Sequence, residues 1–278
     1  MEDNNILSKH LVVCDCDGTL LKASVGVPPV NTEAICAFNE AGGKFTIATG
    51  RTLPAVQRYL HQMGSFSAPV ILCGGALIYD FEKDCPILER VLPRDSATVA
   101  VLQIINAFPA IGVDIAAGKK FFVVKNNEIS HRHSSLDSLK YTLTDIDHVP
   151  DHWYKVLFHI AEEDIDRVEA FANSLELPGI YFVKTGPWYL EMMAEGVDKG
   201  SAIDYLMQYL NIPQQNLIAI GDYDNDIPML TKASFAVCMG DAPDRVKVIC
   251  DMVTKPCLEG GVAQFLDYFR NNACCFDK

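Results

Sequence analysis

Long hydrophobic runs are missing from this sequence, and so is a secretory signal. No uninterrupted apolar stretch approaches the roughly 20 residues that a membrane-spanning helix needs. Residues 1–5 are polar and acidic, whereas a signal peptide begins with basic residues followed by an apolar segment. We therefore expect a cytoplasmic protein that does not bind a membrane.

Basic residues are outnumbered in this chain. It has 23 lysines and arginines against 36 aspartates and glutamates, which gives a formal net charge of -13 at pH 7. A surface this acidic repels nucleic acid and anionic membranes, so we expect neither as a partner. It also repels a phosphorylated metabolite. A site for such a ligand must therefore supply local positive charge from a metal ion, a lysine or helix N-termini.

The cysteine spacing of zinc and redox sites is also lacking. The chain has ten cysteines, but no two of them form a C-x-x-C pair. Several lie inside or beside apolar runs, where a free cysteine packs as a small hydrophobic side chain; these are Cys14, Cys16, Cys36, Cys73 and Cys238. We expect free thiols in a reducing compartment.

Strand-like and helical patterns alternate at both ends of the 278-residue chain. Short apolar runs that stop at turn-forming residues predict strands at 11–14, 45–48, 70–72, 217–220 and 235–237. Apolar residues at helical spacing predict helices at 31–42, with Asn31 as N-cap, and at 54–63, 200–210, 242–250 and 261–269. This alternation predicts an α/β fold with a doubly wound parallel sheet and right-handed crossovers.

The middle of the chain has a different pattern. Strand-like runs at 121–124, 155–159 and 181–183 mix with helical patterns at 96–108 and 163–175. We expect residues 83–186 to form an inserted α+β domain of ordinary size, and residues 1–82 and 187–278 to form the α/β core. We expect a monomer or a small homo-oligomer.

The first motif that carries chemistry is Asp15-Cys16-Asp17-Gly18-Thr19-Leu20, which directly follows a predicted strand. Because side chains alternate along a strand, Asp15 and Asp17 can address one point beyond its end, where open α/β sheets bind ligands. Two carboxylates that converge there need a cation or a shared proton. Gly18 lets the chain turn sharply and approach a ligand. Taken alone, the motif is equally consistent with an ordinary turn.

Two single-residue signals are weaker. Thr49-Gly50-Arg51 comes just after a predicted strand, and a hydroxyl beside a glycine is a small anion cradle. Taken alone, a helix-initiating turn explains that segment better.

Lys199 begins a predicted helix, against the usual preference for Asp or Glu in the first turn. Its position is explained if the lysine faces an anion or a carboxylate, although a solvated surface lysine is the commoner case.

The fourth motif is Gly221-Asp222-Tyr223-Asp224-Asn225-Asp226, which follows the strand predicted at 217–220. Hard, oxygen-only ligands suit Mg²⁺, which takes one or two carboxylates together with waters and phosphate. A loop rich in turn residues is the alternative, and the density of aspartate makes it the weaker one. Together the four motifs supply the nucleophile, the charge neutralisation and the positioning that phosphoryl transfer needs.

In this order, the motifs resemble those of the haloacid dehalogenase superfamily of phosphatases. The match comprises Asp15-x-Asp17-Gly18-Thr19, Thr49, Lys199 and Gly221-Asp222-x-x-Asn225-Asp226, with a long insert between the second and third motifs. The chain most resembles the Cof-type sugar-phosphate phosphatases, which carry a large α/β cap in that place. A further similarity is Gly74-Gly75-Ala76, although relatives usually have Asn where this chain has Gly74.

The resemblance implies a role for each matching residue. Asp15 would attack phosphorus and form an aspartyl-phosphate, and Asp17 would act as general acid and base. The implied cofactor is Mg²⁺, held by Asp15, the main-chain carbonyl of Asp17, Asp222, and Asp226 as a ligand or beside the ligands. The implied phosphate-binding set is Gly18, Thr19, Thr49, Gly50, Lys199 and Asn225. Lys199 and Mg²⁺ would keep Asp15 ionised beside Asp17, so that the pair divides nucleophile and acid duties.

The implied activity is hydrolysis of a small phosphomonoester, either a sugar phosphate or a cofactor-precursor phosphate. The cap would close, exclude water and select the substrate, with Arg51, Trp188 and Glu191 as candidate substrate contacts. A phosphomutase or phosphotransferase with the same Asp15 intermediate is the alternative. A non-catalytic binding module is disfavoured, because its signature would be a lost nucleophile or metal carboxylate. The exact substrate does not follow from the sequence.

Overall fold

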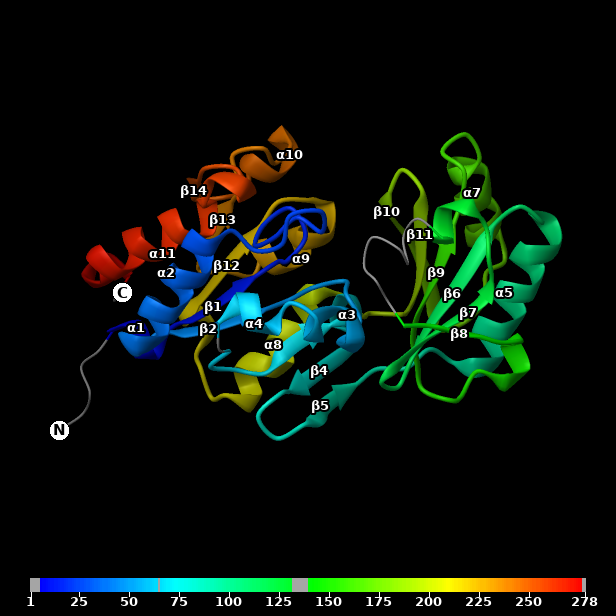
Figure 1. The fold of residues 1–278 in the computed structure, drawn as a ribbon, viewed down its shortest axis with the longest axis horizontal. Coiled ribbons are helices and arrows are strands. Elements are labelled where there is room, and N and C mark those ends of the chain that lie inside the picture. The colour runs from blue at the N-terminus through cyan, green and yellow to red at the C-terminus, as the bar shows by residue number, and fades with distance from the viewer. Residues whose placement is uncertain (1–5, 65, 132–139, 277–278) are drawn as a thin grey trace. The chain divides into compact units, whose positions relative to one another are not determined.

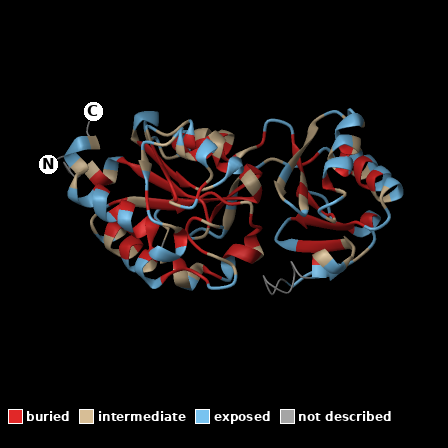
Figure 2. Ribbon diagram, turned by 90° about the horizontal axis from the view of Figure 1, so that it is seen from above, coloured by how far each residue is buried: buried red, intermediate tan, exposed pale blue. Residues whose placement is uncertain are grey.

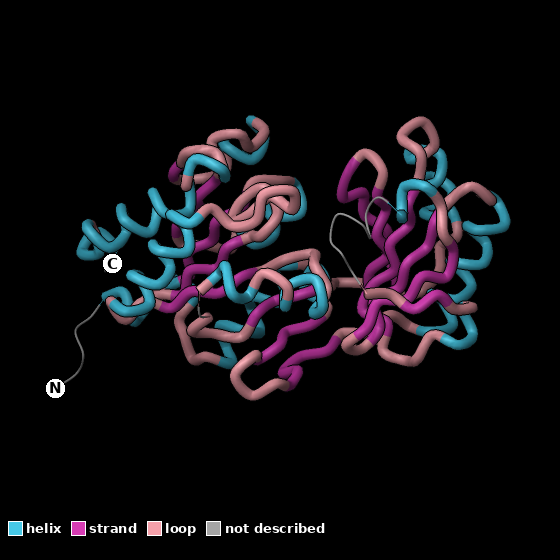
Figure 3. Tube along the Cα trace, in the orientation of Figure 1, coloured by secondary structure: helices cyan, strands magenta, loops and turns pink. Residues whose placement is uncertain are grey.

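The computed structural model describes residues 6–64, 66–131 and 140–276. The chain divides into two compact units, each of which is described by itself. The first unit comprises Met1–Gly50, Gln57–Ile87 and Asp198–Lys278, and the second comprises Arg51–Val56 and Leu88–Val197. Both units contain helices and strands, and in the second unit several strands follow one another along the chain (Figure 3).

A five-stranded parallel sheet in the order β14-β13-β12-β1-β2 is the centre of the first unit (Figure 1). Its strands are β1 (Leu11–Cys14), β2 (Lys44–Ile47), β12 (Leu217–Gly221), β13 (Phe235–Cys238) and β14 (Met252–Val253). Strands β1 and β12 are buried along their whole length, which is why both read as continuous apolar runs. Figure 2 shows the same concentration of buried residues on the central strands.

Helices pack on both faces of this sheet. Helices α2 (Pro29–Glu40) and α11 (Gly261–Asn271) pack against each other on one side, and α8 (Lys199–Tyr209) and α9 (Ile227–Leu230) do so on the other (Figure 1). The described residues of the unit also form the short helices α1 (Ile6–Lys9), α4 (Leu60–Met63) and α10 (Asp244–Lys247). The predicted doubly wound α/β core is thus confirmed.

The strand order reverses beside β1. The chain leaves β1 to form β2 on one side, and it returns much later to form β12 on the other side. Ligands of open α/β sheets bind at such a reversal, outside the carboxyl ends of the strands. Asp15 follows β1 and Asp222 follows β12, so the topology brings these two residues to that point.

The strand at 70–72 does not extend the parallel sheet, so that expectation was wrong. Strand β3 (Val70–Leu72) pairs antiparallel with β4 (Leu77–Asp80), and β5 (Cys85–Glu89) completes a separate three-stranded sheet. An isolated parallel bridge between Ala48 and Ile71 places the end of β2 beside β3. The tight turn after Leu72 sends the chain straight back and pairs one edge of β3 with β4, while its other edge meets the parallel sheet only at that bridge.

The expected N-cap of the first long helix was also wrong. Helix α2 begins at Pro29 after an N-cap at Pro28, and Asn31 is fully buried inside it. The Asn31 amide donates to the Leu20 carbonyl, at 3.3 Å, and its oxygen accepts from the Ala263 N–H, at 3.1 Å. Its side chain therefore joins three segments of the core and does not cap the helix. The helix expected at 54–63 is two short ones, α3 (Leu53–Gln57) and α4.

The second unit has α+β architecture. Its six-stranded sheet has the order β10-β11-β9-β6-β7-β8, and its pairs are antiparallel except β7 with β8. Helices α5 (Arg94–Ala107) and α7 (Ile165–Ser174) lie on the same side of the sheet (Figure 1). The strands are β6 (Gly112–Ala117), β7 (Lys120–Lys125), β8 (Thr142–Leu143), β9 (Trp153–His159), β10 (Ile180–Gly186) and β11 (Tyr189–Ala194).

The limits of the second unit differ from the expected insert at 83–186. Strand β11 lies in the segment that we had assigned to the core, but it pairs with β9 and β10 of the second unit. The unit that begins at Leu88 therefore continues to Val197.

No helix within the described residues is both long enough and apolar enough to span a bilayer.

Candidate active site

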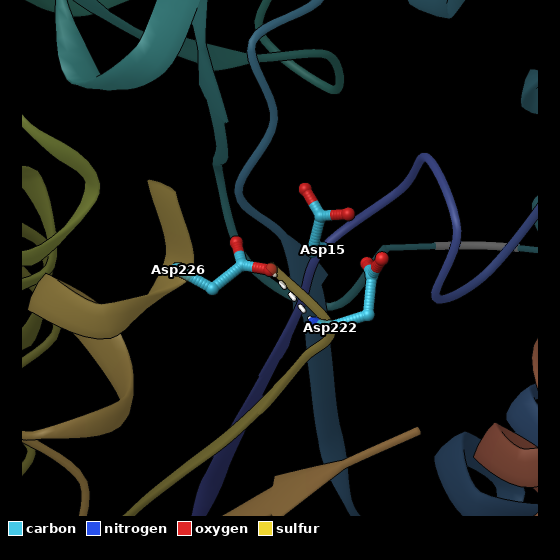
Figure 4. Close-up of side chains that lie close together, drawn as sticks. All are labelled: Asp15, Asp222 and Asp226. Carbon is cyan, nitrogen blue, oxygen red and sulfur yellow. Dashed lines mark hydrogen bonds between the residues drawn. The ribbon is translucent and has the colours of Figure 1, made fainter. Parts of the chain in front are cut away.

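Three aspartates gather at the switch point of the parallel sheet. Asp15 follows β1, Asp222 follows β12, and Asp226 ends the short 3-10 helix η4 (Asp224–Asp226) (Figure 4). One carboxylate oxygen from each lies within 4.8 Å of the others. Asp15 is 4% exposed and Asp226 is 1% exposed, while Asp222 is partly exposed. Oxygen ligands in this arrangement suit a hard divalent cation such as Mg²⁺.

Lys199 lies against two of these carboxylates. Its Nζ donates to Asp15 Oδ1 at 2.5 Å and to Asp226 Oδ1 at 2.6 Å, and the side chain is only 2% exposed. The residue before it, Asp198, caps α8 by accepting from the Ser201 N–H at 2.6 Å. The lysine in the first turn thus faces carboxylates, which explains a position that the helix dipole alone disfavours.

The cluster holds more negative than positive charge in a buried place. Burial, and then the neighbouring carboxylate of Asp226, raise the pKa of Asp15 well above its ordinary value, although Lys199 lowers it. Burial also raises the pKa of Asp222 to about 7, although a hydrogen bond from Thr19 opposes the shift. Burial lowers the pKa of Lys199, but the carboxylates of Asp15 and Asp226 outweigh it and raise the pKa above the ordinary value. The cluster therefore needs protons or a cation to balance its charge.

Local contacts fix the Asp222 carboxylate. The Thr19 hydroxyl donates to Asp222 Oδ1 at 2.6 Å. Gly18 has φ +92°, and a Cβ on it would lie 2.4 Å from Asp222 Oδ2, so both the backbone and the space require glycine. We had expected Gly18 and Thr19 among the phosphate-binding residues. In the structure their contacts are with a carboxylate, and the phosphate role stays a prediction.

Asp226 organises the loop that carries Asp222. Its Oδ2 accepts from the Asp222 N–H at 2.8 Å, drawn as a dashed line in Figure 4, and from the Tyr223 N–H at 3.1 Å. Its Oδ1 accepts from Lys199. Both oxygens of Asp226 are therefore engaged by protein donors.

Asp17 is not part of the buried cluster. Strand β1 ends at Cys14, so the alternation that we used to pair Asp15 with Asp17 does not extend to position 17. Asp17 lies in the turn and is exposed, whereas Asp15 is buried. Strand alternation therefore does not support the expectation that both side chains point to one place, and that expectation stays a prediction. The proposed acid and base role of Asp17 does not depend on that inference.

The remaining phosphate candidates differ in exposure. Thr49 follows β2 and is 1% exposed, Gly50 is half-buried, and Asn225 in η4 is exposed. The three candidate substrate contacts belong to the second unit or to its Arg51–Val56 segment. Arg51 is buried and Trp188 is 44% exposed, while Glu191 on β11 accepts from the buried Lys155 at 2.6 Å. Glu191 thus has an internal partner.

One residue beside the site, Arg245, was not predicted from any local pattern. Arg245 of α10 makes a two-pronged ion pair with Asp224, with Nε at 2.6 Å and Nη2 at 2.9 Å. Its guanidinium carbon also lies 5.5 Å from the centre of the Tyr223 ring. Arg245 therefore holds the η4 loop from outside. Only the folded chain brings it there, since it lies well downstream in the sequence.

Fold and site place the protein among the α/β enzymes that bind their ligand at the carboxyl edge of a parallel sheet. A sequence profile of the haloacid dehalogenase-like hydrolase family matches residues 12–266, and the chain belongs to that family. The prediction that it is an enzyme of this family, a hydrolase, is confirmed.

Individual relatives cover nearly the whole chain. It is 26% identical over 272 residues to the 5-amino-6-(5-phospho-D-ribitylamino)uracil phosphatase of Bacillus subtilis, covering 94% of this chain and 97% of the relative. It is 23% identical over 269 residues to the pyridoxal phosphate phosphatase of Escherichia coli, covering 94% and 98%.

Two solved structures show the same fold. A haloacid dehalogenase-like hydrolase from Bacteroides thetaiotaomicron superposes with a TM-score of 0.85 at 23% identity, covering 94% of this chain and 99% of that one. A sugar phosphatase of haloacid dehalogenase subclass IIB gives 0.79 at 22% identity, with the same two coverages of 94% and 99%. These likenesses confirm the predicted α/β fold class.

Proposed function

We propose that this protein is a Mg²⁺-dependent phosphatase that hydrolyses a small phosphomonoester through an aspartyl-phosphate on Asp15. The observation that carries the proposal is the buried contact of Lys199 with Asp15 inside the aspartate cluster. A carboxylate is a nucleophile only when it is ionised, and a neighbouring ammonium favours the ionised form. Lys199 supplies that charge and lowers the pKa of Asp15, which burial raises.

The residues present fit Mg²⁺. The cluster offers oxygen ligands only, and burial raises the pKa of both Asp15 and Asp222, so the site lacks positive charge. Asp15, Asp222 and the main-chain carbonyl of Asp17 would hold the ion. Asp226 would lie beside them, because its two oxygens already accept from Lys199 and from two N–H groups. When bound, the ion neutralises charge on the phosphoryl group.

The chain's own residues carry out nucleophilic attack, proton transfer and binding of the phosphoryl group. Asp15 attacks phosphorus, and the leaving alkoxide takes a proton from Asp17. A water then attacks the aspartyl-phosphate while Asp17 takes back a proton, which releases phosphate and restores both carboxyl groups. Lys199, Thr49 and Asn225 bind phosphoryl oxygens. The exposed position of Asp17 suits a group that must exchange protons with a substrate and with water.

The activities of the relatives support a substrate class. Two of them act on cofactor-related phosphates, a 5-phospho-D-ribitylamino uracil and pyridoxal phosphate, and a protein of the same fold is a sugar phosphatase. We propose a phosphomonoester of a sugar or of a cofactor precursor, with the second unit as the cap that selects it. A cytoplasmic monomer or small homo-oligomer stays a prediction.

The test is phosphate release from a panel of sugar, nucleotide and cofactor monophosphates, with Mg²⁺ and with EDTA. Wild type is compared with Asp15→Asn, which keeps the shape but removes the nucleophile, and with Asp267→Asn, an exposed aspartate on α11. We expect Mg²⁺-dependent release that is lost in Asp15→Asn alone. A phosphomutase would instead convert a hexose phosphate to its isomer without net release. No release from wild type across the panel would contradict the hydrolase proposal.

A further inference from the structure

The turn that joins β3 to β4 has an unusual backbone. Three consecutive residues have positive φ: Cys73 at 51°, Gly74 at 67° and Gly75 at 111°. Cys73 carries a β-carbon and is 1% exposed, so a residue type that rarely adopts this conformation does so inside the core. Such conformations persist where the surrounding structure holds them, and they are often associated with function.

One side of this turn holds Thr49. The Gly74 N–H donates to the Thr49 carbonyl at 2.9 Å, and the Thr49 N–H donates to the Ile71 carbonyl of β3 at 2.9 Å. Both main-chain polar groups of Thr49 are therefore bonded to the hairpin. Since Thr49 lies beyond the end of β2, the hairpin fixes its main chain where the parallel sheet no longer does.

The other side of the turn lies against the start of α8. A Cβ on Gly75 would be 2.2 Å from the carbonyl oxygen of Asp198 and 2.6 Å from its carbonyl carbon. Asp198 is the N-cap of α8, and Lys199 is the first residue of that helix. The two backbones touch, so any side chain at position 75 must move the segment that carries Lys199.

We propose that the β3–β4 turn is a positioning element that sets the separation between Thr49 and Lys199, with Gly75 as its determining residue. The two residues come from distant parts of the sequence, and the turn contacts the backbone beside each of them. This inference rests on the proposed function, in which both residues bind phosphoryl oxygens. Neither Gly74 nor Gly75 touches the substrate, and both act through their neighbours.

The first test is Gly75→Ala. Its Cβ reaches ordinary contact distance, 3.4 Å, only if the start of α8 retreats by about 1 Å. A misplacement of about 1 Å can cost roughly 100-fold in rate, so we expect kcat to fall by about 10- to 100-fold. Affinity for orthophosphate in the presence of Mg²⁺ should fall by at least about 10-fold, because Lys199 no longer lies against its partners.

Gly118→Ala is the matched control. Gly118 also has positive φ, at 54°, but a Cβ there meets no atom within 4 Å. It tests a side chain at a positive φ without a collision, and it lies in the second unit. We expect wild-type kcat and orthophosphate affinity for this variant.

A double-mutant cycle decides whether Gly75 acts through Lys199. Gly75→Ala should weaken orthophosphate binding in the wild-type background but add little to Lys199→Met. Equal losses in both backgrounds, or a Gly75→Ala protein that matches Gly118→Ala, would overturn the proposal. If wild type binds no orthophosphate and turns over no ester, the proposed function falls, and this inference falls with it.

A second variant covers the case in which Gly75→Ala does not fold. Asp198→Ala removes the hydrogen bond to the Ser201 N–H and releases the same helix start without a collision. We expect it to weaken orthophosphate binding in the wild-type background and not in Lys199→Met. A folded Asp198→Ala protein with unchanged orthophosphate affinity would overturn the proposal.

Discussion

Lys199→Met is the substitution that separates charge balance from packing in the aspartate cluster. Methionine has a similar length and keeps the apolar stem, but it leaves the carboxylates of Asp15 and Asp226 without their ammonium partner. Breaking a buried ion pair on one side costs about 3–5 kcal/mol. At about 2–4 °C per kcal/mol for a domain of this size, the midpoint of thermal unfolding should fall by roughly 10 °C in EDTA.

Mg²⁺ should reverse part of this loss. The variant has one more uncompensated negative charge beside the proposed ion, and the repulsion between the ammonium and a divalent cation is gone. We expect Lys199→Met to bind Mg²⁺ at least as tightly as wild type. Its melting point should therefore rise more on adding Mg²⁺ than the wild-type melting point does. Phosphate release should nevertheless be lost, because the phosphoryl oxygens have no ammonium partner.

Lys155→Met is the matched control for these melts. Lys155 is also a buried lysine in an ion pair, with its Nζ 2.6 Å from Glu191 Oε1, but it lies in the sheet of the second unit. This variant should lose stability and respond to Mg²⁺ as wild type does. The charge-balance reasoning is refuted if Lys199→Met and Lys155→Met respond equally to Mg²⁺, or if Lys199→Met releases phosphate at the wild-type rate.

Three further predictions concern the same loops. Since the pKa of Asp222 is raised to about 7, Mg²⁺ affinity should rise with pH through about 7, which calorimetric Mg²⁺ titration checks. The metal-free protein should lose stability as pH rises from the ordinary carboxyl range to about 7, because in that range only the folded state holds the proton. Urea unfolding in EDTA checks this second sign. Gly18→Ala should weaken Mg²⁺ binding at least about 10-fold by displacing Asp222, whereas Gly196→Ala, which has positive φ and an open surrounding, should bind Mg²⁺ as wild type does. Arg245→Lys loses the two-pronged pair with the exposed Asp224, so the free energy of unfolding should change by less than about 1 kcal/mol. The kcat should nevertheless fall several-fold. A fall in kcat that is matched by a corresponding loss of stability would show that the loop is merely destabilised.

The sequence predicts this site well where the signal is contiguous. Asp15 and Asp222 each follow an apolar run that is buried on both sides, and a run of this kind followed by Asp or Gly places its last side chain at a strand end. Lys199 stood out because it occupies a helix position that the dipole disfavours. Each of these predictions needed only a few neighbouring residues and the periodicity of one element.

The errors arise where the structure depends on contacts outside the element whose pattern was used. Val70–Leu72 has the composition of a parallel strand, and only the turn at Cys73–Gly75 determines that it pairs with β4. Asn31 looks like a helix cap, yet its amide bonds to Leu20 and Ala263. For Asp17 the limit is local: strand alternation was carried three residues past Cys14, where β1 ends. The periodicity of one element does not determine which other segment it pairs with, so periodicity alone cannot predict these contacts.

The contacts of Asp226 explain why the cluster needs three carboxylates and not two. A metal ligand must keep a lone pair for the ion, whereas Asp226 accepts one hydrogen bond at Oδ1, from Lys199, and two at Oδ2, from the N–H groups of Asp222 and Tyr223. An amide could satisfy only one side, because its NH₂ would face either the ammonium or the two N–H donors. The carboxylate at 226 thus ties the position of Lys199 to that of Asp222. Since Lys199 also contacts Asp15, the nucleophile, its counter-ion and the proposed metal ligand share one hydrogen-bonded frame, and a shift in any of them moves the others.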